Sequence, residues 1–209
     1  MKIAVVSESS VDEAAIKIII DAIIGIETEV VPLRPRPGGW SQIFIKLPKI
    51  VETLYYSVQD VRGLIVVMDS DDETPHQPSH DEPHGESLDC RLCLARSILR
   101  RALAGINKQP NRPTLKIAIG LAVPEIEAWY RCGIDPRVNE AAWIRKLKGE
   151  DVGYDRRSLK LDTYGSHRID TLAAIESAKR IAGNLELLIR LFPHGFGSLV
   201  RDVRGWLED

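Results

Sequence analysis

Four short apolar segments alternate with longer amphipathic segments in this chain, and this alternation restricts the fold more than any other feature. The apolar segments cover residues 2–7, 29–33, 63–68 and 114–121. The third of them, GLIVVM, is apolar at every position, which is typical of a strand that is covered on both faces. Strands that alternate with helices form a parallel sheet. The sequence therefore predicts an α/β fold with a central sheet of about four mainly parallel strands and helices on both faces.

The segments around these strands show the apolar periodicity of helices. We expect helices over residues 11–25, 41–58, 87–106, 125–132, 136–148, 171–191 and 198–207, with an irregular charged stretch at 149–165. The chain then consists of an α/β part at residues 1–135 and a helical extension at residues 136–209. Because 209 residues is the length of one domain, we expect the extension to pack on the same core.

The balance of charges limits the partners of the chain. Lys and Arg number 28 and Asp and Glu number 30, which gives a net charge of −2. A broad basic face for nucleic acid usually brings a large positive excess, so a nucleic-acid partner would have to be held by a local feature. The odd number of cysteines argues against a secreted disulfide framework, and no segment resembles a signal peptide or a membrane span. We expect a cytoplasmic protein without a membrane partner.

Acidic residues follow three of the four predicted strands. They are Glu8 and Asp12 after the first strand, Asp69 and Asp71 after the third, and Glu125 and Glu127 after the fourth. The carboxyl ends of parallel strands meet at one edge of the sheet, where ligands bind. Like charges gathered there cost free energy unless a cation neutralises them, and oxygen ligands suit Mg²⁺ or Mn²⁺. The sequence therefore predicts a divalent-cation site at this edge.

Each acid also has a purely structural interpretation. Glu8 and Glu125 could favour the dipoles of the helices that follow them, and Glu127 could pair with Arg131 one turn later. Glu125 and Glu127 would lie about 200° apart on a helix, so we expect only one of them to face the site. Asp72 is expected to be solvated. The secondary candidates for the site are Asp12, Glu125 and Asp72.

The order of the acidic motifs is similar to that of a known family. An acid at the end of the first strand is followed four residues later by another, Glu8 and Asp12, and a D-x-D motif, Asp69 and Asp71, follows a hydrophobic strand. This order resembles the Toprim domain of topoisomerases, primases and overcoming-lysogenization-defect nucleases. The string PEIEAWY at residues 124–130 resembles the I-E-A-W motif of a Toprim-like bacterial family of unknown function, often encoded beside ATPases. The resemblance covers about the first 135 residues.

The resemblance implies a Rossmann-like sheet and a metal-dependent phosphodiesterase or nuclease, in a defence or DNA-processing system. Asp69 and Asp71 would hold Mg²⁺ (or Mn²⁺). Glu8 would be a general acid/base or a further ligand, and Glu127 would complete the acidic cluster as the second candidate catalytic residue. The implied partners are nucleic acid, with DNA favoured over RNA, and an ATPase encoded nearby, and the chain could form a homodimer.

Two other functions stay open. A D-x-D nucleotide-sugar transferase would hold Mn²⁺ on a diphosphate with Asp69 and Asp71. A non-catalytic, Toprim-shaped interaction module is favoured by the low basic charge and by Ser9, which stands where Toprim domains usually have Gly. Arg34 and Arg36, in the loop after the second strand, are candidate phosphate contacts.

The loop after the third strand carries His76, His80 and His84, and Cys90 and Cys93 come shortly afterwards. Zinc is bound by such Cys and His side chains. The C-x₂-C pair falls within a predicted helix, however, and the prolines between the histidines forbid the helix that a His-x₃-His pair would need. The sequence favours a solvated loop with two half-buried thiols over a structural zinc site.

Overall fold

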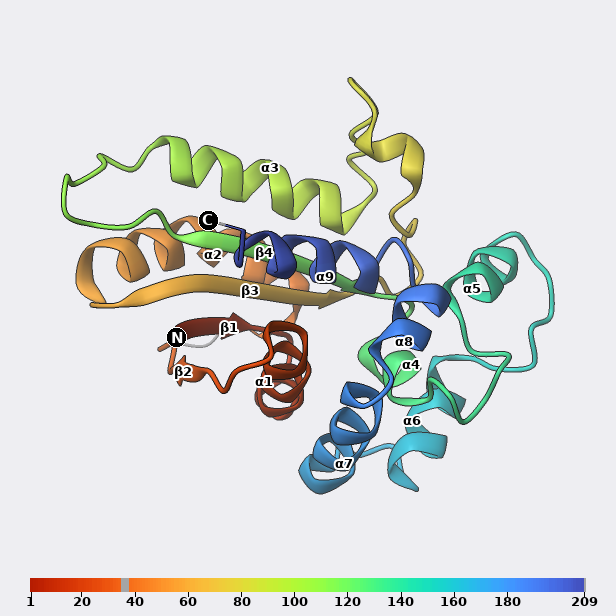
Figure 1. The fold of residues 1–209 in the computed structure, drawn as a ribbon. Helices are drawn as coiled ribbons and strands as arrows, with labels where there is room; N and C mark the ends of the chain where they lie inside the picture. Colours follow the sequence, from red (N-terminus) through yellow and green to blue (C-terminus); the bar gives the residue numbers. More distant parts are fainter. Residues whose placement is uncertain (35–37, 209) are drawn as a thin grey trace.

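The chain folds around a four-stranded parallel sheet, which confirms the predicted fold class (Figure 1). The computed structural model describes residues 1–34 and 38–208. The strands are β1 (Lys2–Val6), β2 (Glu29–Val31), β3 (Val61–Asp69) and β4 (Lys116–Ala122). They lie in the order β2-β1-β3-β4, and every pairing is parallel. All four strands therefore end at the same edge of the sheet.

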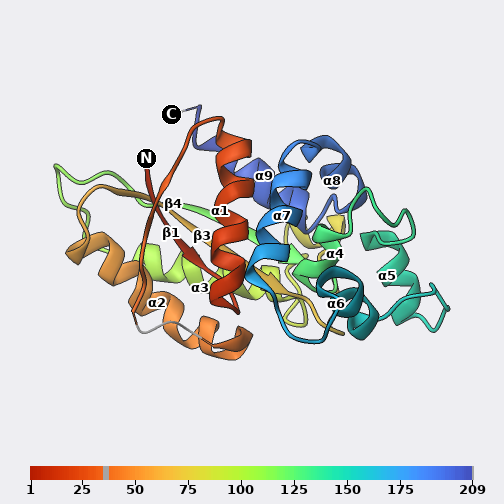
Figure 2. The ribbon, with the colours of Figure 1, turned by 90° about the horizontal axis from the view of Figure 1, so that it is seen from below.

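Helices cover both faces of this sheet. The covering helices are α1 (Ser10–Ile24), α2 (Gly39–Ser57), α3 (Arg91–Ala104) and α9 (Phe196–Gly205), and α7 (Thr171–Ala182) packs against α1. Helices α2 and α3 pack together on one face, and α1 and α9 pack on the other. Figure 1 shows α3 above the sheet and α1 below it, and Figure 2 shows α7 lying along α1.

The remaining helices gather beyond the carboxyl ends of the strands (Figure 1). They are α4 (Ile126–Tyr130), α5 (Glu140–Leu147), α6 (Arg156–Tyr164) and α8 (Leu185–Leu191), and a short 3₁₀ helix, η1 (Pro78–Asp81), lies in the loop after β3. The predicted irregular stretch at 149–165 is wrong, because α6 forms there behind a capping box made by Asp155 and Ser158. The predicted single helix at 171–191 is also wrong, because Gly183 ends α7 and α8 begins after Asn184.

One hydrophobic core contains side chains from both parts of the chain. The strands contribute fully buried residues such as Ile3 and Ile65, and α1 contributes its isoleucines. Helix α9 adds Phe196 and Leu199 to the same core, and Phe196 meets the ring of Trp129 edge to face. No described helix combines the length and apolar character needed to cross a membrane.

Candidate functional site

The switch point of the sheet lies between β1 and β3. From these two neighbouring strands the chain continues toward opposite sides, to β2 and to β4, and ligands of open α/β sheets bind outside such a point. Glu8 follows β1 and Asp69 ends β3, so the topology places the two acids side by side. The backbone N–H of Asp69 donates to Oε1 of Glu8 at 3.1 Å.

Helix α4 brings two more acids to this point. Its first residue, Ile126, donates its backbone N–H to Oδ1 of Asp69 at 3.0 Å. Glu125 and Glu127 are 0% and 2% exposed, and their charges add to the effect of burial, which is the largest cause of the raised pKa of Asp69. The prediction that only one of them faces the site is therefore wrong. Glu125 precedes the helix and is extended (φ −148°, ψ 165°), so the two residues do not share one helical wheel.

Asp12 joins these residues from the first turn of α1, where it is 7% exposed. The helix begins at this place because Ser9 caps it: its hydroxyl accepts the backbone N–H of Val11 at 3.1 Å. Ser9 has φ −132°, which any residue adopts, so this turn does not need the glycine found in Toprim domains. We call Glu8, Asp12, Asp69, Glu125 and Glu127 the acidic cluster.

Burial and mutual repulsion make the ionised state of the acidic cluster costly. Burial first, and then the charges of Glu127 and Glu8, raise the pKa of Asp12 to about 7. Burial and the charge of Glu127 raise the pKa of Glu125 to about 7. The pKa of Asp69 is raised well above its usual value by burial and then by its acidic neighbours, and burial also raises that of Glu8.

Three basic side chains that the sequence did not indicate surround the acids. Nζ of Lys160 lies 3.1 Å and Nε of Arg156 lies 3.3 Å from Oε2 of Glu125. Nη1 of Arg91 donates to the carbonyl of Asp69 at 2.6 Å and to Oδ2 of Asp71 at 2.7 Å, and Arg156 pairs with the other oxygen of Asp71. The carboxylate of Asp71 is therefore engaged by two arginines.

Several buried oxygens of the acidic cluster have no hydrogen-bond partner within the described chain. They are Oδ1 of Asp12, Oε1 of Glu125 and Oε2 of Glu127. The hydroxyl of Tyr164 interacts with the carboxyl of Glu127, and that of Tyr130 interacts with Asp12, but neither contact reaches the geometry of a full hydrogen bond. Burial, and then the charges of Glu127 and Asp12, raise the pKa of Tyr164. Unpartnered buried carboxylate oxygens are costly by themselves, and a bound cation would satisfy them.

Other predicted positions lie away from the acidic cluster. Asp72 is solvated as expected, with a 73% exposed side chain 3.6 Å from Arg156. Arg34 is exposed and lines a separate pocket beside β2 and α2, and Arg36 lies outside the described residues. The side chain of Arg131, the suggested partner of Glu127, donates to the carbonyl of Asp162 at 3.0 Å.

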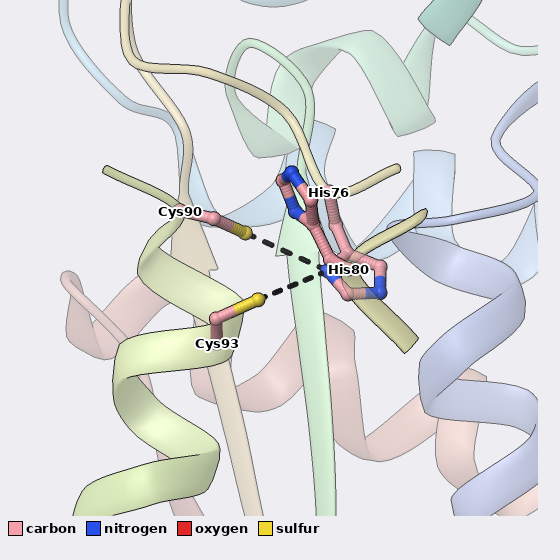
Figure 3. Close-up of side chains that lie close together, drawn as sticks. All are labelled: His76, His80, Cys90 and Cys93. Atoms are coloured by element: carbon pink, nitrogen blue, oxygen red, sulfur yellow. Dashed lines mark hydrogen bonds between the residues drawn. The ribbon is translucent and has the colours of Figure 1, made fainter. Parts of the chain in front are cut away.

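A second group of side chains converges beside the start of α3 (Figure 3). Donor atoms of His76, His80, Cys90 and Cys93 all lie within 4.8 Å of one another; we call these residues the His/Cys cluster. Among the described residues this is the one group of potential metal ligands that meets so closely. Most of the loop is exposed as predicted, but the prediction of half-buried thiols is wrong, because Cys90 is 0% and Cys93 is 3% exposed, and His76 is also fully buried. His84 is exposed and stands outside the cluster.

Two signals in the sequence could have revealed more of these surroundings. Asp155 and Ser158 have the spacing of a capping box, which predicts the start of α6, and Arg156 and Lys160 then fall on one face of that helix. Arg91 lies between the two cysteines, at the start of α3, close to the D-x-D motif along the chain. Comparison of the chain with family models, with curated proteins and with solved structures finds no significant match.

Proposed function

We propose that this chain is a Toprim-like, metal-dependent phosphodiesterase that cleaves nucleic acid. One observation carries the proposal: acids that follow three different strands meet at the switch point of a parallel sheet, where Asp12, Glu125 and Glu127 are buried and each has a carboxylate oxygen without a hydrogen-bond partner among the described residues. Such an arrangement costs stability unless a ligand compensates for it. The resemblance of the acidic motifs to Toprim domains indicates the same chemistry.

The acidic cluster suits Mg²⁺ or Mn²⁺, because all its donors are carboxylate oxygens. Asp69 and Glu127 would hold the ion, and Glu8, Asp12 and Glu125 lie next to them. Bound there, the ion would polarise a phosphoryl oxygen and favour deprotonation of an attacking water. The donors do not converge within 4.8 Å of one another, so we expect the carboxylates to move inward on binding.

The basic residues at the rim would hold the phosphate groups. Arg156 and Lys160 line a shallow pocket next to the acids, together with Arg157 and His167. Asp71 would position Arg91 and Arg156 through its two ion pairs. Such a local basic surface would allow a chain with a net charge of −2 to bind a polyanion such as DNA.

Glu8 is the candidate general base of this site. Burial raises the pKa of its carboxyl, which brings it closer to the neutral range in which a general base works best. Its Oε1 is fixed by the N–H of Asp69, while Asp69 itself is fixed by the N–H of Ile126. Glu8 can therefore accept a proton from a water beside the ion without a large movement of the backbone.

The engagement of Asp71 disfavours a D-x-D transferase. A transferase of that type would need Asp69 and Asp71 together on the metal and its diphosphate. Here Asp71 is turned toward Arg91 and Arg156, and it has a left-handed backbone (φ 50°) that separates its direction from that of Asp69. A non-catalytic interaction module is the outcome that the following experiment distinguishes from an enzyme.

The test is cleavage of plasmid, single-stranded DNA and RNA by the purified chain with Mg²⁺, Mn²⁺ or EDTA. We expect cleavage with metal, DNA being cut in preference to RNA, and loss of cleavage in Asp69→Asn and Glu8→Gln. Glu140→Gln is the matched control, because Glu140 is also buried (1% exposed) but lies outside the acidic cluster. Absence of both cleavage and Mg²⁺ binding by calorimetry, alone and with an ATPase encoded nearby, would overturn the proposal.

A further inference from the structure

The His/Cys cluster combines a loop and a helix end that the sequence separates. His76 precedes η1 and His80 lies within it, while Cys90 is the N-cap residue of α3 and Cys93 lies in its first turn. Figure 3 shows the four side chains turned toward one another. Gly85 permits this folding of the loop, since a Cβ there would stand 1.9 Å from the carbonyl oxygen of Ser79 in η1.

The distances within the cluster match those of a tetrahedral metal site. Nδ1 of His76 lies 3.6 Å from Sγ of Cys90 and 3.5 Å from Sγ of Cys93. Zinc bonds of about 2.3 Å to sulfur and about 2.0–2.1 Å to nitrogen, at tetrahedral angles, place sulfur and nitrogen about 3.6 Å apart. The structure thus holds two edges of the tetrahedron at the length that zinc requires.

Hydrogen bonding alone does not explain this arrangement. Nε2 of His76 lies 3.1 Å from Oδ1 of Asp81, so it carries the ring proton and Nδ1 offers a single lone pair. That lone pair can accept one thiol proton in good geometry, yet two thiols lie at the same distance from it. Nδ1 of His80 is also buried and has no hydrogen-bond partner among the described residues. A cation at the centre would satisfy all four donors.

The surroundings of His76 resemble the outer layer of a metal site. Metal-bound histidines usually donate their second ring nitrogen to a carboxylate, which fixes the ring and strengthens the ligand. Asp81 fills this position, and Nη1 of Arg96 holds Asp81 in turn at 2.5 Å. An open surface pocket lined by His80, Cys93 and Arg96 reaches the cluster and provides a path for the ion.

We propose that His76, His80, Cys90 and Cys93 bind a zinc ion with a structural role. Four protein ligands complete a tetrahedral coordination and leave no open position for a substrate, as in structural zinc sites. The two arguments against zinc from the sequence do not hold in this fold. His76 and His80 do not need an α-helix between them, because the 3₁₀ helix η1, which begins at Pro78, brings the two residues together. Cys90 is the N-cap residue of α3 and therefore precedes the helix instead of lying within it.

The bound ion would fasten the long loop after β3 to α3. Arg91, the residue after Cys90, contacts the carbonyl of Asp69 and the carboxylate of Asp71. Zinc would therefore hold Arg91 in place at the edge of the acidic cluster without itself touching that cluster. The zinc proposal does not depend on the nuclease proposal, since the two groups of ligands have no residue in common.

The test is metal analysis of the full chain purified without a histidine tag. We expect one zinc ion per chain by plasma mass spectrometry, and a drop in melting temperature when a strong chelator removes it. Co²⁺ added to the metal-free protein should give the intense near-ultraviolet band of cobalt bound to thiolate. Cys93→Ser and His80→Ala should lose the zinc, while Cys132→Ser and His84→Ala should keep it.

The test of zinc binding does not depend on whether any single variant folds. If Cys93→Ser fails to fold, the partly exposed His80 still provides a mild substitution, and the cobalt spectrum is recorded on the unmodified chain. A folded wild-type protein that contains no zinc, shows no rise in melting temperature with added zinc and gives no thiolate band with Co²⁺ would overturn the proposal.

Discussion

The acidic cluster and the His/Cys cluster lie close to the same loop, but they are built on opposite physical principles. Carboxylates repel one another when they are ionised, and Arg91, Arg156 and Lys160 border the acidic cluster. Buried thiols and imidazoles are neutral, and burial raises the pKa of Cys90 to about 12 and lowers that of His76 to about 4. Neutral donors can pack at 3.5–3.6 Å without a counter-charge.

This difference decides how each cluster should be interpreted. Close convergence is the expected sign of a site whose donors are neutral when no metal is bound. For carboxylates the corresponding sign is burial with unpartnered oxygens, because repulsion prevents convergence until a cation binds. We therefore expect the acidic cluster to bind a metal reversibly, together with its substrate, and the His/Cys cluster to keep its metal.

Replacement of one carboxylate of the acidic cluster should give the largest effect, a loss of cleavage without a loss of zinc. Glu127→Gln removes the charge of a residue whose Oε2 is unpartnered, and it should lower metal-dependent cleavage by about 10³-fold, the loss of several kcal/mol of transition-state stabilisation. The zinc content of the variant should be that of the wild type. Cleavage rates and metal analysis on the same preparation measure both effects. Equal loss of zinc and of cleavage would show that the clusters are not independent.

Replacement of Arg91 should test the connection between the clusters. Arg91 is 7% exposed, and Arg91→Met removes its hydrogen bonds to the carbonyl of Asp69 and to the carboxylate of Asp71, which keeps its ion pair with Arg156. Because both lost hydrogen bonds involve a charged donor, we expect a loss of about 3 kcal/mol in the free energy of unfolding, measured by urea denaturation. Arg100→Met on the same helix is the control, because Arg100 is exposed and should change stability by about 0.5 kcal/mol or less. An equal effect of both variants would contradict the assigned role.

The acidic cluster could be predicted from the sequence further than its surroundings could. Parallel strands end at one edge, so the positions of Glu8 and Asp69 followed from the order of the elements alone. The arrangement of Glu125 and Glu127 could not be predicted in this way, because α4 begins one residue later than expected and leaves Glu125 outside the helix. The partners Arg156 and Lys160 come from α6, a helix that is not expected from the sequence because the segment is strongly polar and Leu159 is its one buried residue.

The His/Cys cluster was misjudged for a different reason. Periodicity describes side chains on regular helices and strands, whereas His76 and His80 are brought together by a loop and a 3₁₀ turn. Their burial depends on the packing of that loop against α3, which no local pattern encodes. The fold class followed from hydrophobic periodicity, and the two clusters show where that signal ends: at loops, and at contacts between distant segments.

The pH dependence of stability should show the effect of burial on a carboxyl group that no other acid repels. Burial alone raises the pKa of Glu140 from 4.5 to about 7, and no acidic neighbour contributes. Because the folded state holds this proton more tightly, Glu140 stabilises the protein below pH 4.5, and that contribution is lost as the pH rises to 7. Glu140→Gln should therefore unfold like wild type at pH 4.5 and be about 3 kcal/mol more stable at pH 8.

The control for this variant is a comparison of its unfolding in Mg²⁺ and in EDTA. Glu140 donates no oxygen to the acidic cluster, so the difference between Glu140→Gln and wild type at pH 8 should be the same with Mg²⁺ and with EDTA. Urea denaturation at both pH values measures it. If the difference in stability vanishes in Mg²⁺, the ion also compensates for the charge of Glu140, and the acidic cluster would then extend to α5.

Loss of the carboxylate behind His76 should give the smallest effect, confined to the His/Cys cluster. Asp81→Asn keeps the size of the side chain but removes the charge that Nε2 of His76 and Nη1 of Arg96 contact. Replacing such an outer partner weakens metal binding by about 10–100-fold, which corresponds to about 1.4–2.7 kcal/mol. Competition with a zinc indicator measures this change, and cleavage by the acidic cluster should be unaffected. Unchanged zinc affinity would show that Asp81 contributes only to the ion pair with Arg96, and that packing alone orients the ring of His76.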